Sequence, residues 1–163
     1  MSSDPIKVAP EKVEYRHYKD ESQLPQIIEL IEKDLSEPYS VFTYRYFIHN
    51  WPQLCLLAYV EDQFIGTIIC KLDDHRGRKR GYIAMLAVEK AYRGNKIGTA
   101  LVNKALEIMK QMGADEVVLE TEASNTGAQK LYESLGFAKD KILMNYYLNG
   151  QKAYRLKLWF TDQ

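Results

Sequence analysis

The hydrophobic pattern of the first fifty residues predicts one strand and two helices. Apolar and charged side chains alternate over residues 13–18, which is typical of an outer strand. Between residues 24 and 35 the apolar positions recur at helical spacing, with Ser22 as the expected N-cap. Pro38 interrupts this pattern, and the aromatic segment after it predicts a short second helix over residues 44–50.

Three strands are expected next. Residues 54–60 and 64–72 are apolar runs separated by three polar residues, which predicts an antiparallel hairpin. Residues 82–88 form a continuous apolar run, the pattern of a strand buried on both faces, so we expect it at the centre of the sheet. The basic segment 75–80 before it is predicted to be a solvated loop, with Arg76, Arg78, Lys79 and Arg80 as its cations.

The second half of the chain continues with helices and strands in alternation. One apolar stripe predicts a long helix ended by Gly113, with its members at Ile97, Leu101, Ala105, Ile108 and Met112. A strand is expected over residues 116–121, a helix over 125–135, and two strands over 137–147 and 153–160 around the turn Asn149-Gly150. This order predicts an α/β fold with a central mixed sheet flanked by about four helices. We expect a single domain over residues 13–163, preceded by a flexible tail over residues 1–12.

Composition and charge exclude several classes of protein. The 163 residues carry 22 Lys plus Arg and 22 Asp plus Glu, so the chain lacks the basic excess of a domain that holds nucleic acid by its own field. No apolar run approaches the ~20 residues of a membrane helix, and the N-terminus resembles no signal peptide. We therefore expect a cytoplasmic protein, with the nucleus as a second location. Cys55 and Cys70 lie in apolar runs and are expected as buried, reduced thiols, and no metal site is expected.

The most informative segment is the junction between the strand at residues 82–88 and the helix that starts near Ile97. A turn with Arg93, Gly94 and Gly98 joins them. The free amides and the positive dipole end of a helix start can bind a phosphate group, and glycines allow close approach to the backbone. Such a turn is often only a helix cap, and this one is neither a Rossmann fingerprint nor a Walker A loop.

Two motifs resemble the GCN5-related N-acetyltransferase (GNAT) family. The segment from Arg93 to Gly98 is similar to the family's pyrophosphate signature R/Q-x-x-G-x-G/A, with Lys96 in place of the first glycine. Residues 125–137 resemble its N-x-x-A-x-x-L-Y-x-x-x-G-F segment. The resemblance implies a GNAT fold with acetyl-CoA as co-substrate and no metal. The implied acetyl-CoA contacts are Met85, Leu86, Ala87, Val88, Arg93, Gly94, Asn95, Lys96, Ile97, Gly98, Thr99, Asn125 and Tyr132.

Within that family, the segments 34–40, 44–47, 119–122 and 146–149 resemble catalytic subunits of NatC-type N-terminal acetyltransferases. This resemblance implies acetylation of nascent proteins that retain Met followed by a large hydrophobic residue. It also implies two partners, a large scaffold auxiliary subunit and a small Sm-like auxiliary subunit. Ribosome attachment is then expected to come from the partners, with no membrane and no specific nucleic acid bound by this chain.

Two residues are candidates for proton transfer. A protein N-terminal amine has a pKa of about 8, so forming its neutral state at pH 7 costs only about 1.4 kcal/mol, and one general base is enough. Glu120, near the carboxyl end of its strand, is the predicted base; the alternative is a carboxylate salt-bridged at a strand end. Tyr132 matches the position of the family's tyrosine against the CoA sulfur and is the predicted acid; the alternative is a core tyrosine.

Apolar and aromatic residues, together with one carboxylate, are predicted to hold the substrate peptide. They are Leu35, Glu37, Pro38, Tyr39, Tyr146 and Tyr147. Glu37 or Tyr39 would contact the backbone or amine groups of the peptide. The alternative is that these tyrosines pack the sheet and the helix pair. Two other functions remain open from the sequence: a GNAT acetyltransferase for lysine or small amines, and a non-catalytic acetyl-CoA-binding module made possible by Lys96.

Overall fold

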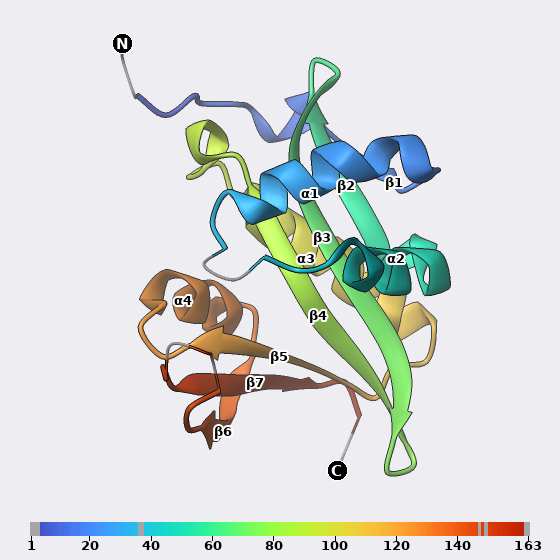
Figure 1. Ribbon diagram of the computed structural model, residues 1–163, viewed down its shortest axis with the longest axis vertical. Coiled ribbons are helices and arrows are strands. Elements are labelled where there is room, and N and C mark those ends of the chain that lie inside the picture. The colour runs from blue at the N-terminus through green and yellow to red at the C-terminus, as the bar shows by residue number, and fades with distance from the viewer. Residues whose placement is uncertain (1–3, 36–37, 147, 149, 162–163) are drawn as a thin grey trace. The chain divides into compact units, whose positions relative to one another are not determined.

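The computed structural model describes residues 4–35, 38–146, 148 and 150–161 (Figure 1). Its strands pair in the order β1-β2-β3-β4-β5-β7-β6. The elements in chain order are β1 (Val13–His17), α1 (Leu24–Glu32), α2 (Val41–Asn50), β2 (Cys55–Val60), β3 (Gln63–His75), β4 (Arg78–Val88), α3 (Ile97–Gln111), β5 (Glu116–Glu122), α4 (Thr126–Ser134), β6 (Ala138–Leu143) and β7 (Ala153–Trp159). β4 pairs parallel with β5 at the centre of a mixed sheet. The predicted order and the α/β class are confirmed.

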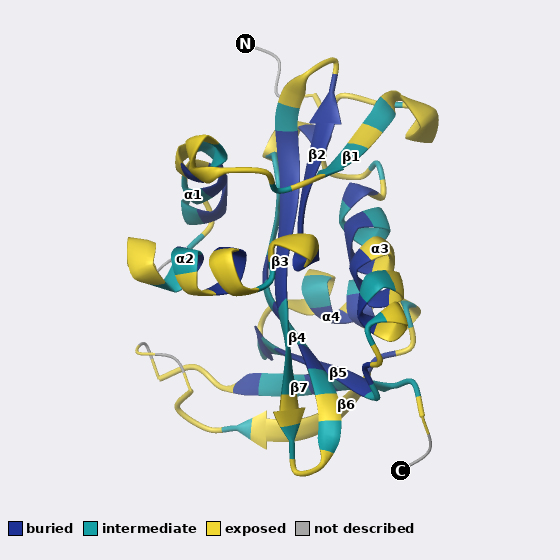
Figure 2. Ribbon diagram, turned by 90° about the vertical axis from the view of Figure 1, so that its right-hand side faces the viewer, coloured by how far each residue is buried: buried dark blue, intermediate teal, exposed yellow. Residues whose placement is uncertain are grey.

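The chain forms two compact units that interleave in sequence. The first comprises residues 1–71 and 84–108, and the second comprises residues 72–83 and 109–163. In the first unit, α1 and α2 lie on one side of β2 and β3, and α3 lies on the other (Figure 2). Its fully buried side chains include Ile27, Tyr44, Leu57, Ile65 and Leu101. The single domain and the flexible tail stay predictions.

A side-chain cap begins α2, whereas α1 follows directly on a capped 3₁₀ turn. The Asp20 carboxylate accepts a hydrogen bond from the Ser22 N–H at 2.9 Å, at a short 3₁₀ turn directly before α1. Ser22 lies inside this turn, and Gln23, the residue directly before α1, makes no side-chain capping bond, so the prediction of Ser22 as the N-cap is wrong. The hydroxyl of Ser40 accepts from the Thr43 N–H at 3.4 Å, so α2 begins at Val41, earlier than predicted.

Two tight turns join β2, β3 and β4. Glu61 and Asp62 have φ values of 50° and 65°, and Arg76 and Gly77 have 52° and 81°. Two left-handed residues in succession are the geometry of a type I′ hairpin turn. β3 and β4 thus extend to His75 and Arg78, and the prediction of a loop over residues 75–80 is wrong. β4 alternates buried with half-buried positions, so burial on both of its faces is also wrong.

The second unit is built around β5, which pairs antiparallel with β7 from Glu116–Trp159 to Glu122–Ala153. β6 and β7 form the predicted antiparallel pair, but β6 ends at Leu143 and β7 begins at Ala153. The connection between these two strands is therefore longer than the two-residue turn that the sequence predicts. Asn149, one residue of that predicted turn, lies outside the described residues. On α3 the buried positions are Ile97, Leu101, Val102, Ala105, Leu106 and Met109. The predictions of Ile97, Leu101 and Ala105 are confirmed, whereas Ile108 and Met112 are only half-buried, so their place in the stripe is wrong.

Both cysteines are fully buried and reduced, as predicted. Cys55 on β2 and Cys70 on β3 have no exposed surface. Burial raises the pKa of the Cys55 thiol to about 12, against a smaller lowering by the Thr67 hydroxyl, and burial also raises the pKa of Cys70. Among the described helices, none is long and apolar enough to cross a membrane.

Candidate active site

The turn between β4 and α3, in the first unit, has the backbone shape of an anion-binding loop. Gly94 and Lys96 adopt φ values of 88° and 59°, both in the left-handed region. Left-handed residues in a turn let neighbouring N–H groups converge on one side, a concavity that suits phosphate oxygens. A Cβ added to Gly94 would meet no atom within 4 Å, so there is room for a larger side chain. Glycine is favoured at this position because of its left-handed φ angle. Lys96 occupies the glycine position of the family signature and keeps the glycine-like backbone.

Arg93 fastens this loop to the neighbouring elements of the first unit. Its Nε donates to the Val88 carbonyl at 3.1 Å, which ties the loop back to the end of β4. The guanidinium also forms an ion pair with Asp34, just after α1. Ala100 N–H donates to the Lys96 carbonyl at 3.0 Å, the first helical bond of α3. The side chain of Arg93 remains half exposed, so it can still face a phosphate.

The Asn95 carboxamide is bound to backbone groups of the protein. Its Nδ2 donates to the carbonyls of Tyr92 at 2.8 Å and Ile6 at 2.7 Å, and its Oδ1 accepts from the Val8 N–H at 2.9 Å. Any ligand contact by Asn95 is therefore left to its main chain. Sequence reasoning missed these contacts because Ile6 and Val8 are 87 to 89 residues away along the chain.

The end of β4 presents backbone that the β5 ladder does not use. The described parallel register joins residues 80–82 to 116–118, and residues 85–88 lie beyond it. Met85 is buried, whereas Leu86, Ala87 and Val88 are half-buried. The Glu89 N–H donates to the Ile65 carbonyl at 2.8 Å and so holds this end against β3.

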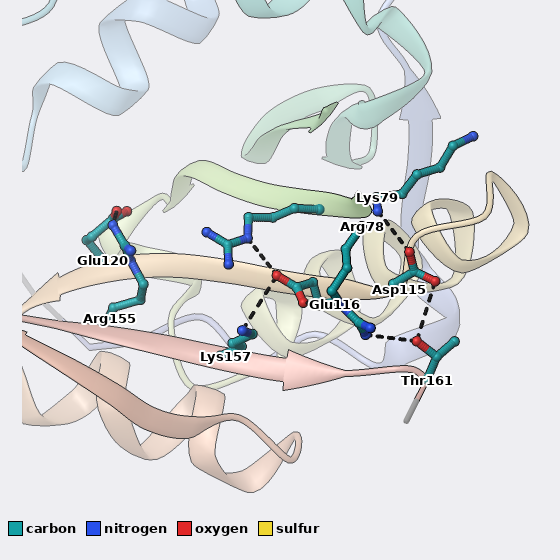
Figure 3. A network of polar contacts seen from close by, with 9 residues as sticks. Arg78, Lys79, Asp115, Glu116, Glu120, Arg155, Lys157 and Thr161 are labelled. Carbon is teal, nitrogen blue, oxygen red and sulfur yellow. Dashed lines mark hydrogen bonds and ion pairs between the residues drawn. The ribbon is translucent and has the colours of Figure 1, made fainter. Parts of the chain in front are cut away.

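In the second unit, Glu120 forms an ion pair across the sheet. Arg155 lies directly opposite it in the β5–β7 register, and Arg155 Nη2 donates to Glu120 Oε1 at 3.1 Å (Figure 3). The Glu120 side chain is 10% exposed. Its Oε2 is buried and has no hydrogen-bond partner among the described residues, and the same holds for Arg155 Nε. The alternative of a carboxylate salt-bridged at a strand end is thus observed for Glu120 Oε1, whereas Oε2 remains available to accept a proton.

Tyr132 lies buried on α4, with its ring packed edge-on against Phe137 at 5.4 Å between centroids. The Asn125 side chain caps this helix by accepting from the Ala128 N–H at 3.1 Å. Gln129, one turn before Tyr132, is buried and donates from Nε2 to the carbonyls of Glu122 and Ala123 at 3.1 and 2.9 Å. Gln129 therefore ties the helix of Tyr132 to the end of the strand of Glu120. The sequence signal was a polar residue on the inward face of α4.

A second carboxylate, Glu116, lies at the opposite end of β5 and was missed in the sequence. It is 1% exposed and pairs with Arg78 at 2.8 Å, Arg80 at 2.7 Å and Lys157 at 3.6 Å (Figure 3). Burial alone would raise the pKa of Glu116, but the hydrogen bonds from Arg80 and Arg78 outweigh it, so its pKa is lowered. Arg78 and Arg80 thus neutralise a buried charge, which explains why residues 78–80 form strand and not loop.

The predicted peptide-binding residues divide between the units. In the first unit, Leu35 is half-buried, Pro38 and Tyr39 are exposed, and the Tyr39 ring lies edge-on to Tyr44 at 5.9 Å. In the second, Tyr146 is 47% exposed in the connection after β6. Glu37 and Tyr147 lie outside the described residues.

The predicted catalytic and cofactor residues divide in the same way. Residues 85–88 and 93–99 belong to the first unit, and Glu120, Asn125 and Tyr132 belong to the second. The structure brings Glu120 to Arg155, and it places Tyr132 on the helix that Asn125 caps. The roles assigned to all of these residues stay predictions. Within the described ranges, no three His, Cys, Asp or Glu side chains gather in a way that could hold a metal ion.

Comparison with known proteins gives consistent similarities. The Acetyltransferase (GNAT) family matches residues 24–137. N-alpha-acetyltransferase 30 of Homo sapiens is 61% identical over 148 residues, 90% of this chain and 41% of the human protein. N-alpha-acetyltransferase MAK3 of Arabidopsis thaliana is 54% identical over 149 residues, 91% of this chain and 78% of the plant protein. This chain therefore spans less than half of the human relative and most of the plant one.

Among solved structures, a chain of the NatC complex bound to Gag peptide and CoA is similar over its whole length. The TM-score is 0.88 and the sequence identity 44%, with 92% of this chain and 99% of that chain covered. An agreement of this extent shows that the fold is shared over 92% of this chain and is not confined to the loop at residues 93–98.

Proposed function

Because the chain belongs to the GNAT acetyltransferase family, we propose that it is the catalytic subunit of a NatC-type N-terminal acetyltransferase. It transfers the acetyl group of acetyl-CoA to the α-amine of proteins that retain Met followed by a hydrophobic residue. The observation that carries the proposal is the 44% identity, over 92% of this chain, to a chain of a NatC complex with CoA and a peptide bound. The names of the human and plant relatives support the same reaction.

Acetyl-CoA fits the loop between β4 and α3. Its pyrophosphate meets the N–H groups around the left-handed residues Gly94 and Lys96 and at the start of α3, with the Lys96 ammonium and Arg93 adding positive charge. The pantetheine arm carries amide groups, and it pairs with the backbone of residues 85–88 like an added strand. The same backbone supplies an N–H to the acetyl oxygen as negative charge develops there.

The transfer is direct, from thioester to amine. The neutral α-amine attacks the thioester carbonyl, the new C–N bond forms, and the C–S bond breaks. Glu120 takes the proton that the amine loses, at Oε2, because Arg155 occupies Oε1. Tyr132 gives its hydroxyl proton to the departing thiolate. Only one modest base is needed, since an α-amine is already partly neutral near pH 7.

Exposed apolar side chains support the peptide and partner assignments. Four apolar side chains in and beside the connection after β6 are exposed: Ile142 by 62%, Met144 by 66%, Tyr146 by 47% and Leu148 by 91%. They receive the substrate's Met and the apolar residue that follows it, together with Leu35, Glu37, Pro38, Tyr39 and Tyr147. On α2, Phe42 is 74% exposed, which suits an auxiliary subunit. A large scaffold subunit and a small Sm-like subunit carry the ribosome contact, in the cytoplasm and the nucleus.

A peptide panel tests this function. The full chain, with and without auxiliary subunits, is given acetyl-CoA and peptides that begin Met-Leu, Met-Ile or Ser-Ala, together with an N-terminally blocked peptide that contains lysine. We expect acetylation of the two Met peptides. Preference for Ser-Ala or for lysine would instead favour another GNAT activity. Acetyl-CoA binding without turnover on any amine, with the auxiliary subunits present, would show a non-catalytic module.

A further inference from the structure

We propose that residues 6–8 form a strap that holds the acetyl-CoA loop in its ligand-binding shape, with Asn95 as the positioning residue. This inference rests on the proposed function, since it assigns a role in acetyl-CoA affinity to residues outside the family signature. The strap precedes β1 and lies beside the turn that follows β4 (Figure 1). Both segments belong to the first unit.

Three hydrogen bonds join the strap to the loop. The Ile6 N–H donates to the Ala91 carbonyl at 2.7 Å, the Ile6 carbonyl accepts from Asn95 Nδ2 at 2.7 Å, and the Val8 N–H donates to Asn95 Oδ1 at 2.9 Å. The carboxamide of Asn95 thus pairs with the strap as a peptide group of a neighbouring strand would. All the strap atoms involved are main-chain atoms, and the Ile6 side chain itself is 44% exposed.

Asn95 is placed where its side chain can control the loop backbone. It stands between Gly94 and Lys96, whose φ values of 88° and 59° create the concave run of N–H groups. An L residue such as lysine disfavours that conformation, so the loop needs outside contacts to keep it. Asn95 Nδ2 also donates to the Tyr92 carbonyl at 2.8 Å, and Tyr92 is buried. The carboxamide therefore connects the strap, the buried start of the loop and the peptide groups that face the phosphates.

The expected consequence is specific to one step of the reaction. Loosening the strap lets the loop leave its phosphate-binding shape, which raises the Kd and KM for acetyl-CoA because only the fraction of chains with the competent loop binds. Once acetyl-CoA is bound, the loop is held by its ligand. The kcat at saturating acetyl-CoA and the KM for the peptide should then remain at their original values.

Two variants remove the strap contacts in different ways. Asn95→Ala deletes the carboxamide, and Val8→Pro deletes a single N–H donor while keeping an apolar side chain. The matched control is Ala9→Pro, just outside the strap, because Ala9 is exposed, its N–H makes no hydrogen bond among the described residues, and its φ of −65° already suits proline. Calorimetry on the full chain gives the acetyl-CoA Kd, and thermal melting checks the fold.

We expect Val8→Pro, which removes one hydrogen bond, to raise the acetyl-CoA Kd by roughly fivefold. Asn95→Ala removes three hydrogen bonds and should raise the Kd by at least as much. Ala9→Pro should stay within about twofold. An unchanged Kd in both strap variants would overturn the inference, including the case in which only the melting temperature falls. A further variant, Gly94→Val, distinguishes failure of the strap inference from failure of the proposed function. If Gly94→Val leaves the acetyl-CoA Kd unchanged, or if the original chain binds no acetyl-CoA, the assignment of the loop as the acetyl-CoA site is wrong.

Discussion

Arg155 lies directly opposite Glu120 on neighbouring strands, and its guanidinium holds one of the two carboxylate oxygens at 3.1 Å. The second oxygen is buried and has no hydrogen-bond partner among the described residues. A cross-strand pair of this kind restricts the rotation of the carboxylate. The base of the proposed reaction thus has one oxygen fixed by the fold and one oriented for a proton.

Replacing Glu120 by Gln removes the proton acceptor and keeps the shape of the side chain. We expect kcat to fall by about 10²- to 10⁴-fold, the usual contribution of a general base. The Kd for acetyl-CoA should hold, because the loop at residues 93–98 is untouched. Steady-state rates across pH and calorimetry measure the two quantities. A Gln variant with the original rates at every pH would remove Glu120 from the mechanism.

Arg155 is expected to act through Glu120 and is testable as a positioning residue. Arg155→Met leaves the carboxylate without its restraint, and we expect kcat to fall on the order of tenfold to a hundredfold while the KM for acetyl-CoA holds. Arg155→Lys keeps a cation and should recover part of the rate. Melting curves serve as the control for folding. Equal rates in the Lys and Met variants would argue against positioning by an ion pair.

Tyr132→Phe deletes a hydroxyl and retains the ring that packs against Phe137. We expect kcat to fall by about 10²-fold or more, because the departing thiolate loses its proton donor. Stability should change by about 1 kcal/mol or less. The matched control is Tyr154→Phe on β7, which should leave the rate unchanged. A large fall in melting temperature with an unaltered rate would identify Tyr132 as a core residue.

Glu116 makes stability depend on pH. The pKa of Glu116 is lowered in the folded protein below its ordinary 4.5, so its contribution is present above 4.5 and is lost as the pH falls through the folded value. Glu116→Gln leaves Arg78, Arg80 and Lys157 without their carboxylate, and we expect a loss of about 3–5 kcal/mol at pH 7.

Urea unfolding at pH 7 and at several values below 4.5 measures this effect. The difference between Glu116→Gln and the original chain should narrow as the pH falls. Glu14→Gln, an exposed carboxylate on β1, is the control and should change stability little at either pH. A constant difference across the series would contradict the assignment of the acid sensitivity to Glu116.

Lys96→Gly tests the strain in the acetyl-CoA loop. Lysine at φ 59° costs about 1–2 kcal/mol, and glycine costs about 0.5–1 kcal/mol in chain entropy, so a gain of between about 0 and 1.5 kcal/mol is expected. Glu107→Gly, at an exposed position inside α3, should instead lose about 1 kcal/mol. Thermal and urea unfolding measure both. Equal losses in the two variants would mean that Lys96 is not strained.

The periodicity of the sequence was enough to predict the order of strands and helices, because each element buries a face that its own residues define. The central place of β4 is also confirmed, although the burial on both faces from which it was inferred is not observed. It failed at residues 75–80, where Arg78 and Arg80 resemble loop residues until Glu116 is known to lie beside them. Arg78 and Arg80 are 38 and 36 positions away from Glu116 along the chain, and no local sequence pattern indicates such a pairing.

The candidate site shows the same division. Glu120, Tyr132 and the turn at residues 93–98 could be predicted from local motifs and a family resemblance. The residues that orient them could not: Arg155, Gln129 and the Ile6–Val8 contacts with Asn95 are polar pairings formed by tertiary folding. Lys96 is an intermediate case. The motif located it, but a lysine at a glycine position left its backbone angle open, and only the structure gives the glycine-like φ of 59°.

The burial of Cys55 and Cys70 has a practical consequence for measuring turnover. Each acetyl transfer releases one CoA thiol, which is exposed and ionises readily, whereas both protein thiols are inaccessible and have raised pKa values. A thiol-reactive dye added to the native chain therefore reports the product and leaves the protein unmodified. Unfolding would expose both cysteines, so the same dye, used without substrate, counts the chains that have lost their structure.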